Sequence, residues 1–280
     1  MTLTHEQPEM TPSEVADDHK LRSQFMQRLI ADAEHSLCTG DAPTPPRVLV
    51  QFWDDADSVP SDVQACLDSW TPLESSGFKR LLFDDLSAAQ FIKKNFGVRH
   101  VRAFERCSHP AMRADYFRLC FIMKVGGVYI DADDSYQGGR IEELISDSCL
   151  KIQPLCYDLA TGSMVDPVSS AKTKDSEGRI FYVNNNPLIA PPGHPVIERA
   201  LESATSQLLS SDKNSRDIQS LTGPGNLTMC LVLHALGARQ ANSKFDFKLI
   251  PDWNSFATTE WPLAYRSDHR NWRHWVRGYE

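Results

Sequence analysis

The sequence lacks the features that mark several classes of protein. No apolar run approaches the roughly 20 residues that a membrane-spanning helix needs. The opening stretch, MTLTHEQPEMTPSEVADD, is polar and acidic, unlike a signal peptide. No basic face stands out, and the formal net charge is −8, which argues against a nucleic-acid partner. We therefore expect a cytoplasmic protein with no membrane span, with export by a non-classical route left open.

The usual cysteine frameworks and catalytic motifs are also missing. The seven cysteines are scattered and include no CxxC pair, so neither a disulfide scaffold nor a zinc site is indicated. We expect most of them to be buried small hydrophobic residues in a reducing compartment. The chain contains no GxSxG, HExxH or Walker glycine motif, so the function must be sought in other residues.

The N-terminal part differs from the rest of the chain. Residues 1–18 have the composition of a disordered segment, and helical spacing of apolar residues predicts an amphipathic helix over about 19–36. The stretch TGDAPTPP at 39–46 reads as a linker because repeated proline and glycine block regular structure. We therefore divide the chain into an extension at 1–46 and one domain at 47–280.

Strand and helix patterns alternate after residue 46. Short apolar runs at 48–53 and 78–83 predict buried strands, and helical stripes follow each of them. Capping boxes are expected at Ser61 with Gln64 and at Ser87 with Gln90. A third helix should begin at His109-Pro110 and end at Gly126-Gly127. This alternation predicts an α/β fold, whereas residues 158–178 read as a loop.

Three carboxylates follow the glycine pair after a short apolar run. They are Asp131, Asp133 and Asp134, at the end of a predicted strand. On an extended segment, the side chains of Asp131 and Asp133 would share one side and serve one site. Carboxylate oxygens suit a hard divalent cation, which could neutralise a pyrophosphate leaving group. The competing interpretation is a solvated acidic loop, because a bare DxD pattern is common.

Neighbouring residues also have other interpretations. A calcium-binding loop starting at Asp131 would need glycine at its sixth position, where Tyr136 stands, and a helix rather than a strand before it. Asp115 and Arg118 lie three apart on the predicted helix, so taken alone they read as a surface ion pair. Trp53, at a strand end, could stack on a base.

Taken together, these stretches resemble the DXD-containing glycosyltransferases of the Och1-like, "sugar-binding region" type, whose catalytic core is shared by the clostridial glucosylating toxins. Three motifs carry the resemblance, and they are Pro46–Trp53, Arg113–Arg118 running into Gly126–Asp133, and the tail His269–Trp275.

The resemblance implies a GT-A fold, a Rossmann-like mixed sheet flanked by helices, and a retaining hexosyltransferase that uses a nucleotide-sugar donor with Mn²⁺ or Mg²⁺. Trp53 would stack on the nucleobase, and Asp115 with Arg118 would hold the sugar hydroxyls. The resemblance places further residues in the site, which are Tyr129 and Trp275 at the donor, Asp131 at donor and metal, Asp133 and His274 as metal ligands, and Asn185 in the active site. UDP-sugars are favoured over GDP-sugars.

The chain departs from the family pattern in two places. Val50 stands where the first motif usually has histidine, and His274 stands where the tail usually has serine. These changes motivate an alternative, a non-catalytic sugar-nucleotide or carbohydrate-binding module with the same fold. A metal-dependent phosphohydrolase is a third hypothesis. The acceptor, whether a glycan, a lipid-linked sugar, a metabolite or a protein, is not indicated by any stretch of residues.

Overall fold

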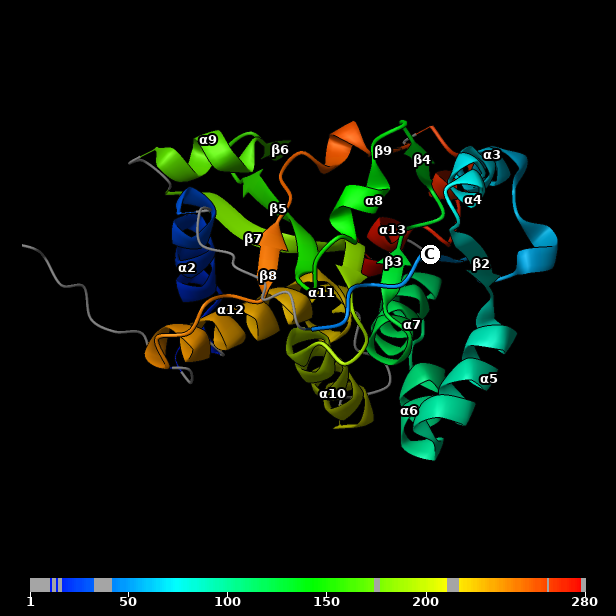
Figure 1. The fold of residues 1–280 in the computed structure, drawn as a ribbon, viewed down its shortest axis with the longest axis horizontal. Coiled ribbons are helices and arrows are strands. Elements are labelled where there is room, and N and C mark those ends of the chain that lie inside the picture. The colour runs from blue at the N-terminus through cyan, green and yellow to red at the C-terminus, as the bar shows by residue number, and fades with distance from the viewer. Residues whose placement is uncertain are drawn as a thin grey trace, which may run out of the picture.

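A computed structural model places the chain around one mixed sheet (Figure 1). It describes residues 11, 14, 17–32, 42–173, 177–210, 217–260 and 262–277. The seven-stranded sheet has the order β2, β1, β3, β7, β5, β6, with β8 paired to β5. Its strands are β1 (Val48–Phe52), β2 (Lys79–Phe83), β3 (Gly127–Tyr129), β5 (Leu150–Asp158), β6 (Ser163–Val165), β7 (Arg179–Ala190) and β8 (Phe247–Leu249).

A second, small sheet pairs β4 (Asp134–Tyr136) with β9 (Ala257–Thr259). The helices are α2 (His19–Ala31), α3 (Ser61–Ser69), α4 (Pro72–Ser75), α5 (Asp85–Phe96), α6 (Val98–Glu105), α7 (Pro110–Lys124), α8 (Ile141–Leu144), α9 (Pro167–Lys172), α10 (Pro195–Ser210), α11 (Ile218–Leu221), α12 (Pro224–Gln240) and α13 (Trp272–Arg277). The described residues also include three 3₁₀ turns, which are η1 (Ala56–Ser58), η2 (Trp253–Ser255) and η3 (Ala264–Ser267).

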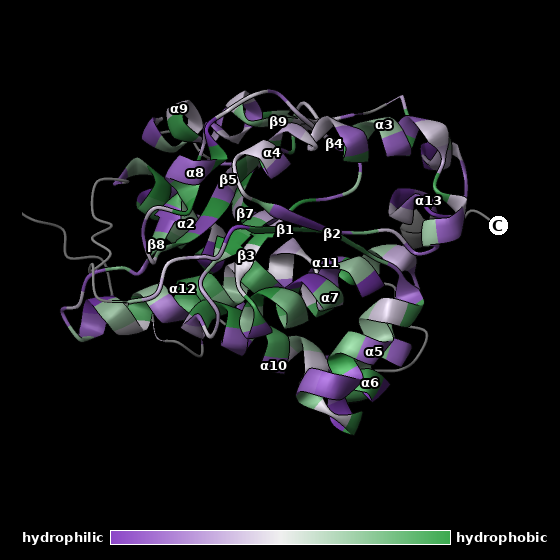
Figure 2. Cartoon of the chain, turned by 45° about the vertical axis from the view of Figure 1, so that its right-hand side comes forward, coloured by the Kyte–Doolittle hydropathy of each residue, from purple (hydrophilic) through white to green (hydrophobic). Residues whose placement is uncertain are grey.

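Strand direction decides where the site lies. Strand β1 runs parallel to β2 and β3, so the carboxyl ends of these three strands meet at one edge of the sheet. Strand β7 runs antiparallel to β3 and carries its own polar residues past the same edge. The predicted α/β class, a mixed sheet flanked by helices, is confirmed. Helices α7, α10 and α12 lie on one side of the sheet, and α3, α4 and α8 lie on the other (Figures 1 and 2).

Both faces of the central strands are buried, because alternate side chains point to opposite sides. Val50 and Tyr129 belong to the core beneath α7, α10 and α12, whereas Leu49 and Val128 pack with Trp70 on the opposite face. Figure 2 accordingly shows the central strands in hydrophobic colours and the outer helices in mixed ones. Continuous apolar runs such as Val48-Leu49-Val50 are typical of strands that are covered on both sides.

Helix α7 begins and ends as expected. The Nδ1 atom of His109 accepts a hydrogen bond from the backbone N–H of Ala111 (3.1 Å), and Pro110 occupies the first helical position, where no N–H is needed. The helix ends at Lys124, and Gly126 and Gly127 follow with φ of +73° and +103°. Positive φ favours glycine, so this pair turns the chain from helix into strand β3.

Gly127 also stands where the backbone of β1 approaches most closely. A Cβ atom there would lie 2.5 Å from the carbonyl oxygen of Val48. We expect Gly127→Ala to lower the free energy of unfolding by about 2 kcal/mol or more, through backbone strain and the steric clash. Gly193→Ala is the matched control, because Gly193 has φ +75° but nothing within 4 Å of the added atom. Urea denaturation of both variants checks this, and equal losses would show that conformation alone matters.

Two histidines cap helices in the same way. His109 caps α7 as described, and Nδ1 of His194 accepts a hydrogen bond from the N–H of Val196 at the start of α10 (3.3 Å). Their Nε2 atoms therefore carry the proton and donate to the carbonyl oxygens of His269 and Asp246, both at 3.0 Å. Burial lowers the pKa of both histidines below 6.5, so the neutral, capping form is favoured.

The cap at His109 gives a pH-dependent contribution to stability. Its folded-state pKa is lowered, so unfolded chains take up the proton first as pH falls below 6.5, and the stabilisation present above pH 6.5 declines. His109→Asn keeps a capping oxygen but cannot titrate. We expect the wild type to lose more stability than this variant between pH 7 and pH 5, measured by urea denaturation. Parallel pH profiles for the two proteins would contradict the prediction.

Several local expectations were wrong. No side chain caps α3 through a hydrogen bond, since its N-cap is Pro60, and the cap of α5 is Asp84, which pairs with Ser87 in a capping box. The predicted loop at 158–178 contains strand β6 and helix α9. Pairing with β5 and packing against α2 stabilise these elements, and neither partner is visible in local sequence.

The N-terminal extension is only partly described. Helix α2 covers His19–Ala31 of the predicted 19–36, and most of the segment expected to be disordered lies outside the described residues. Helix α2 packs against β7, α9 and α12, so it contacts the body of the fold. The division at residue 46 stays a prediction. Within the described part of the chain, no helix combines the length and apolarity that crossing a membrane requires.

The cysteines only partly match the expectation. Five of them are free and buried, namely Cys66, Cys107, Cys120, Cys156 and Cys230. Cys149 is disulfide-bonded, so the expectation of free thiols is wrong for this residue. The sequence offered no spacing signal for this bond, because the position of Cys149 in the fold decides its neighbours.

Candidate functional site

The acidic cluster lies in a turn between β3 and β4. The backbone N–H of Asp134 donates to the carbonyl oxygen of Asp131 (3.2 Å), which closes the turn around Ala132 and Asp133. The expectation of an extended segment, with Asp131 and Asp133 on one side by alternation, is therefore wrong. The turn instead holds each carboxylate against its own set of partners, at the edge where β1 and β3 end.

Arg118 on helix α7 contacts the Asp131 carboxylate. Arg118 Nη2 donates to Asp131 Oδ1 and lies the same distance, 2.9 Å, from Asp115 Oδ1. Its Nη1 donates to the carbonyl oxygen of Asn185 (2.7 Å), and the guanidinium lies 4.4 Å from the ring centroid of Tyr129. Arg118 is only 3% exposed and Asp115 only 6%. The alternative of a surface ion pair is therefore wrong, and the pair forms part of a buried charge network.

Burial shifts the pKa values of this network. It raises the pKa of Asp131 to about 7, against the opposing effect of Arg118, with Asp133 and Asp134 adding to the rise. Burial also raises the pKa of Asp115. Burial alone would lower the pKa of Arg118, but the neighbouring Asp131 carboxylate raises it overall, so the guanidinium stays charged. The charged Arg118 guanidinium thus lies between Asp115 and Asp131, whose ionised forms are destabilised by burial.

Strand β7 supplies amide side chains to the same network. Asn185 Nδ2 donates to Asp115 Oδ1 (2.7 Å). Asn186 Oδ1 accepts from the backbone N–H of Asp131 (3.0 Å), and its Nδ2 donates to Asp134 Oδ2 (2.8 Å). The family resemblance predicted Asn185 as a site residue and did not include Asn186. The run Asn184-Asn185-Asn186 inside a strand was the available signal, because asparagine is depleted in strands.

The family resemblance assigns no role to Asp134, yet this residue is fully buried. Its carboxylate accepts hydrogen bonds from Thr259 Oγ1 on β9 (2.7 Å) and from Asn186. Burial, followed by the charge of Asp133, raises its pKa to about 6. These contacts make Asp134 a positioning residue that ties the turn to β7 and β9.

Asp133 contacts a segment that the sequence did not point to. The hydroxyl of Tyr265 donates to Asp133 Oδ2 (2.6 Å), and Arg266 Nη2 forms an ion pair with the same oxygen. Burial, with the charge of Asp133, raises the pKa of Tyr265, so its hydroxyl keeps the proton that it donates. No motif marked Tyr265 or Arg266, and only the folded chain brings them to the turn.

Trp53 lies beside the turn but is covered. The side chain is 8% exposed, and the ring of Tyr265 packs against it edge-on at 5.3 Å between centroids. The guanidinium of Arg270 lies 5.4 Å from the Trp53 ring. The indole N–H of Trp53 is buried with no hydrogen-bond partner among the described residues, and the same holds for the hydroxyl of Tyr129. Trp53 is therefore close to the acids, as expected, but not open as a stacking surface.

The structure does not bring the whole predicted tail to the site. His274 is exposed on α13, and no group of three or more His, Cys, Asp or Glu side chains that could hold a metal ion occurs within the described ranges. The predicted set of Asp131, Asp133 and His274 is therefore not assembled in this conformation. The side chain of Trp275 lies outside the described part of the chain.

The residues present nevertheless fit a divalent cation that is shared with a substrate. Asp131 and Asp133 offer oxygen ligands at the edge of the sheet. Magnesium-like ions are usually bound by one or two carboxylates, with the remaining ligands supplied by phosphate oxygens and water. A pair of carboxylates, rather than a closed protein cage, is what such a shared ion requires.

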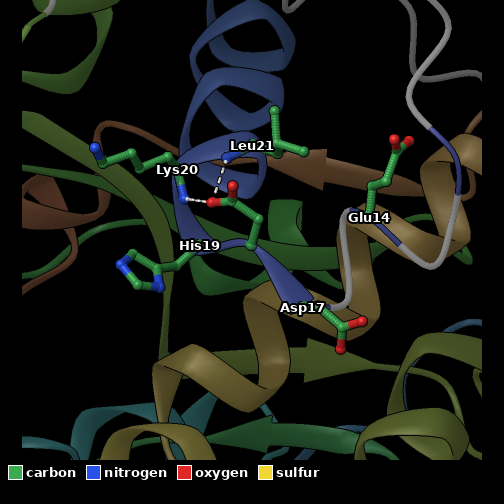
Figure 3. Close-up of a pocket in the computed structure, with 6 residues that line it drawn as sticks. Glu14, Asp17, His19, Lys20 and Leu21 are labelled. Carbon is green, nitrogen blue, oxygen red and sulfur yellow. Dashed lines mark hydrogen bonds between the residues drawn. The ribbon is translucent and has the colours of Figure 1, made fainter.

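A surface hollow lies elsewhere, at the first turn of α2 (Figure 3). There the Asp18 carboxylate accepts hydrogen bonds from the backbone N–H groups of Lys20 (2.7 Å) and Leu21 (3.3 Å). These contacts cap the helix, since a side-chain oxygen satisfies two N–H groups that have no partner inside the helix. The hollow is lined by Glu14 and residues 17–21, and none of the site residues described above is among them.

Comparison with known proteins supports the interpretation of this edge. Residues 50–150 match the family described as "Glycosyltransferase sugar-binding region containing DXD motif". A protein of Acanthamoeba polyphaga mimivirus, "Uncharacterized glycosyltransferase L373", is 26% identical over 89 residues, which cover 31% of this chain and 35% of that protein. The match thus spans about a third of the length of this relative.

One solved structure, "PaToxG Glycosyltransferase", shares 13% identity, with 95% of this chain and 97% of that chain covered. Its TM-score of 0.44 is too low to support a conclusion about fold or function. The family match, in contrast, includes both Trp53 and the acidic turn. Asn185 and the segment that contacts Asp133 fall outside it.

Proposed function

We propose that this chain, whose residues 50–150 match the DXD-containing glycosyltransferase sugar-binding region, is a glycosyltransferase of the GT-A type. It would move a sugar from a nucleotide-diphosphate donor to an acceptor, with Mn²⁺ or Mg²⁺ at Asp131 and Asp133. The observation that carries this proposal is the buried network of Asp115, Arg118 and Asp131 directly beneath the acidic turn.

The network supports a division of the site into two ends. Asp115, Arg118 and Asn185 offer charged and amide groups within 3 Å of one another, which suits recognition of sugar hydroxyls. The turn that holds Asp131 and Asp133 offers carboxylates for a cation bound to the diphosphate. A cation there supplies charge stabilisation of the departing diphosphate.

The reaction exchanges one bond for another at the anomeric carbon of the donor. The bond to the diphosphate oxygen breaks and a bond to the acceptor oxygen forms, and the acceptor proton passes to the leaving diphosphate. Arg118 holds Asp131 in place throughout, because its guanidinium stays charged. The proposal includes two further points that follow the family resemblance. The configuration at the anomeric carbon is retained, and the donor nucleotide is UDP rather than GDP.

A donor panel tests the proposal. The full chain is incubated with UDP-sugars and GDP-sugars, with Mn²⁺ or with a chelator, and donor binding, hydrolysis and sugar transfer are measured. We expect metal-dependent binding of at least one donor and slow release of its sugar to water. Absence of binding and turnover across the panel, in protein with a cooperative thermal transition, would contradict the proposal.

A non-catalytic module is the second candidate, favoured by the covered state of Trp53 and by Val50 at the position where the family usually has histidine. Such a protein would bind donor and metal but release no sugar with any acceptor. The same panel separates the candidates, because measured turnover eliminates the module. Transfer of sugar, rather than release of phosphate alone, separates a transferase from a phosphohydrolase.

A further inference from the structure

The acidic turn is covered by a short segment near the C-terminal end of the described chain, residues 262–271, here named the C-terminal strap. It contains η3 and crosses over the turn and Trp53. The strap reaches the site through two neighbouring residues, since Tyr265 packs against the Trp53 ring and both Tyr265 and Arg266 contact Asp133 Oδ2. The positions assigned above to the nucleobase and to the metal are thus the two positions that the strap contacts.

Further contacts hold the strap on both sides of the site. The backbone N–H of Ala264 donates to Asp62 Oδ2 on α3 (2.6 Å), and the carbonyl oxygen of His269 accepts from His109 at the start of α7 (3.0 Å). Leu263 packs beside Trp53 in a small apolar cluster. The strap therefore has a defined position on the fold, which polar contacts and a few apolar ones stabilise.

The negative charge of the acidic turn explains why a positively charged side chain of the same chain binds there. Asp131, Asp133 and Asp134 lie within four residues, and burial raises the pKa of Asp131 and of Asp134. Asp131 is neutralised by Arg118 and Asp134 is hydrogen-bonded, whereas Asp133 has its ion pair with Arg266. Without that guanidinium or a metal ion, the Asp133 charge would be left largely buried beside two other acids, which is unfavourable.

We propose that the C-terminal strap is an internal occupant of the donor site, with Arg266 in the place of the metal ion and Tyr265 in the place of the nucleobase. This inference rests on the proposed function. In the free protein the strap neutralises Asp133 and shields Trp53. Metal and nucleotide bind only when it leaves, so each ligand that displaces the strap makes binding of the other more favourable.

The strap is suited to displacement. Its regular structure is a single 3₁₀ turn, which is a weaker element than an α-helix of the same length. Its ion pair with Asp133 is partly exposed, with side chains 13% and 15% accessible. A segment with few buried apolar contacts opens at a lower free energy than the core, as lids and binding loops commonly do.

Metal affinity in the absence of nucleotide gives the first test. Mn²⁺ binding to the full chain is measured by calorimetry for wild type, Arg266→Gln and the control Arg99→Gln, whose ion pair with Glu202 lies on the exposed surface of α6. We expect Arg266→Gln to bind Mn²⁺ roughly fivefold more tightly, the equivalent of about 1 kcal/mol, and Arg99→Gln to match the wild type. Tyr265→Phe, which loses only the hydroxyl contact, should give a smaller gain.

Each outcome decides between the two proposals. Equal Mn²⁺ affinity of wild type and Arg266→Gln would overturn the internal occupancy and leave the proposed metal use intact. Absence of Mn²⁺ binding to every variant would overturn the metal use, and the strap proposal with it. A gain of the same size in Arg99→Gln would show that net charge alone is responsible, which also overturns the proposal.

Hydrogen exchange provides a readout that does not depend on activity. Peptides covering residues 262–271 are followed in the wild type, alone and with Mn²⁺ plus UDP. We expect faster exchange in the strap when both ligands are present, with unchanged exchange in the buried part of α7. Exchange in the strap that is unchanged or slower would overturn the proposal, because the strap would then keep its seat while the ligands are bound.

Discussion

Asp133→Asn is expected to reduce sugar transfer by at least about a hundredfold at saturating Mn²⁺. Removing one group that stabilises developing charge typically costs 10²–10³ in rate. Of the two proposed metal positions, Asp133 is paired with Arg266 of the strap, whereas Asp131 is paired with Arg118. The neutral amide keeps the shape of the side chain but is a poor ligand for a hard cation. Initial rates of transfer or donor hydrolysis, measured over a range of Mn²⁺ concentrations, check this.

The control for Asp133→Asn is Asp68→Asn, on the exposed face of α3, where the carboxylate accepts a hydrogen bond from the side-chain amide of Gln64 (2.8 Å). It should retain wild-type rates. Thermal denaturation should place both variants within a few degrees of the wild type, because Tyr265 can still donate to the amide oxygen at position 133. Wild-type turnover by Asp133→Asn would remove this residue from the metal site.

Arg118→Met is expected to lower the free energy of unfolding by roughly 3–5 kcal/mol, the range found when one partner of a buried ion pair is removed. The guanidinium serves Asp115, Asp131 and the carbonyl oxygen of Asn185, and it is 3% exposed. Methionine fills similar space but leaves the buried Asp115 and the partly buried Asp131 without a cation. For a chain of this length, the corresponding fall in Tm is on the order of 10 °C.

Denaturation in urea and by heat measures the effect of Arg118→Met. Arg99→Met is the matched control, since it removes an exposed arginine–carboxylate pair and should change stability by less than about 1 kcal/mol. Arg118→Lys should recover part of the loss, because it restores the charge but not the three-way contact. Similar stability of Arg118→Met and Arg99→Met would show that the network contributes little to folding.

The sequence predicted the elements whose signal is local. Strands β1 and β2 are short apolar runs bounded by proline or acids, and both ends of α7 carry residues with a specific backbone role. Strand β6 and helix α9 were missed because each is stabilised by pairing or packing with distant segments. The caps of α3 and α5 were misplaced because the exact start of a helix is not fixed by local sequence, and the folded chain starts α3 after Pro60 and α5 after Asp84.

The site residues also separate into those that local sequence predicts and those that only the tertiary fold brings to the site. Asp115, Arg118, Asp131 and Asp133 could be found because they lie close together in the sequence on a recognisable helix-to-strand connection. Asn186, Tyr265 and Arg266 could not, because β7 and the strap reach the turn only through the tertiary fold. The turn itself was misread as extended, since an alternation argument holds only while a segment remains a strand.

The guanidinium of Arg118 restricts how this part of the sequence can vary during evolution. Because Asp115 and Asp131 share the same cation, loss of either one changes the charge felt by the other. Substitutions at these two positions will therefore not add, as is usual for residues in one network. A lineage that acquires a different donor sugar is expected to change the two acids together with the arginine, or to keep all three and alter specificity at Asn185 or beyond.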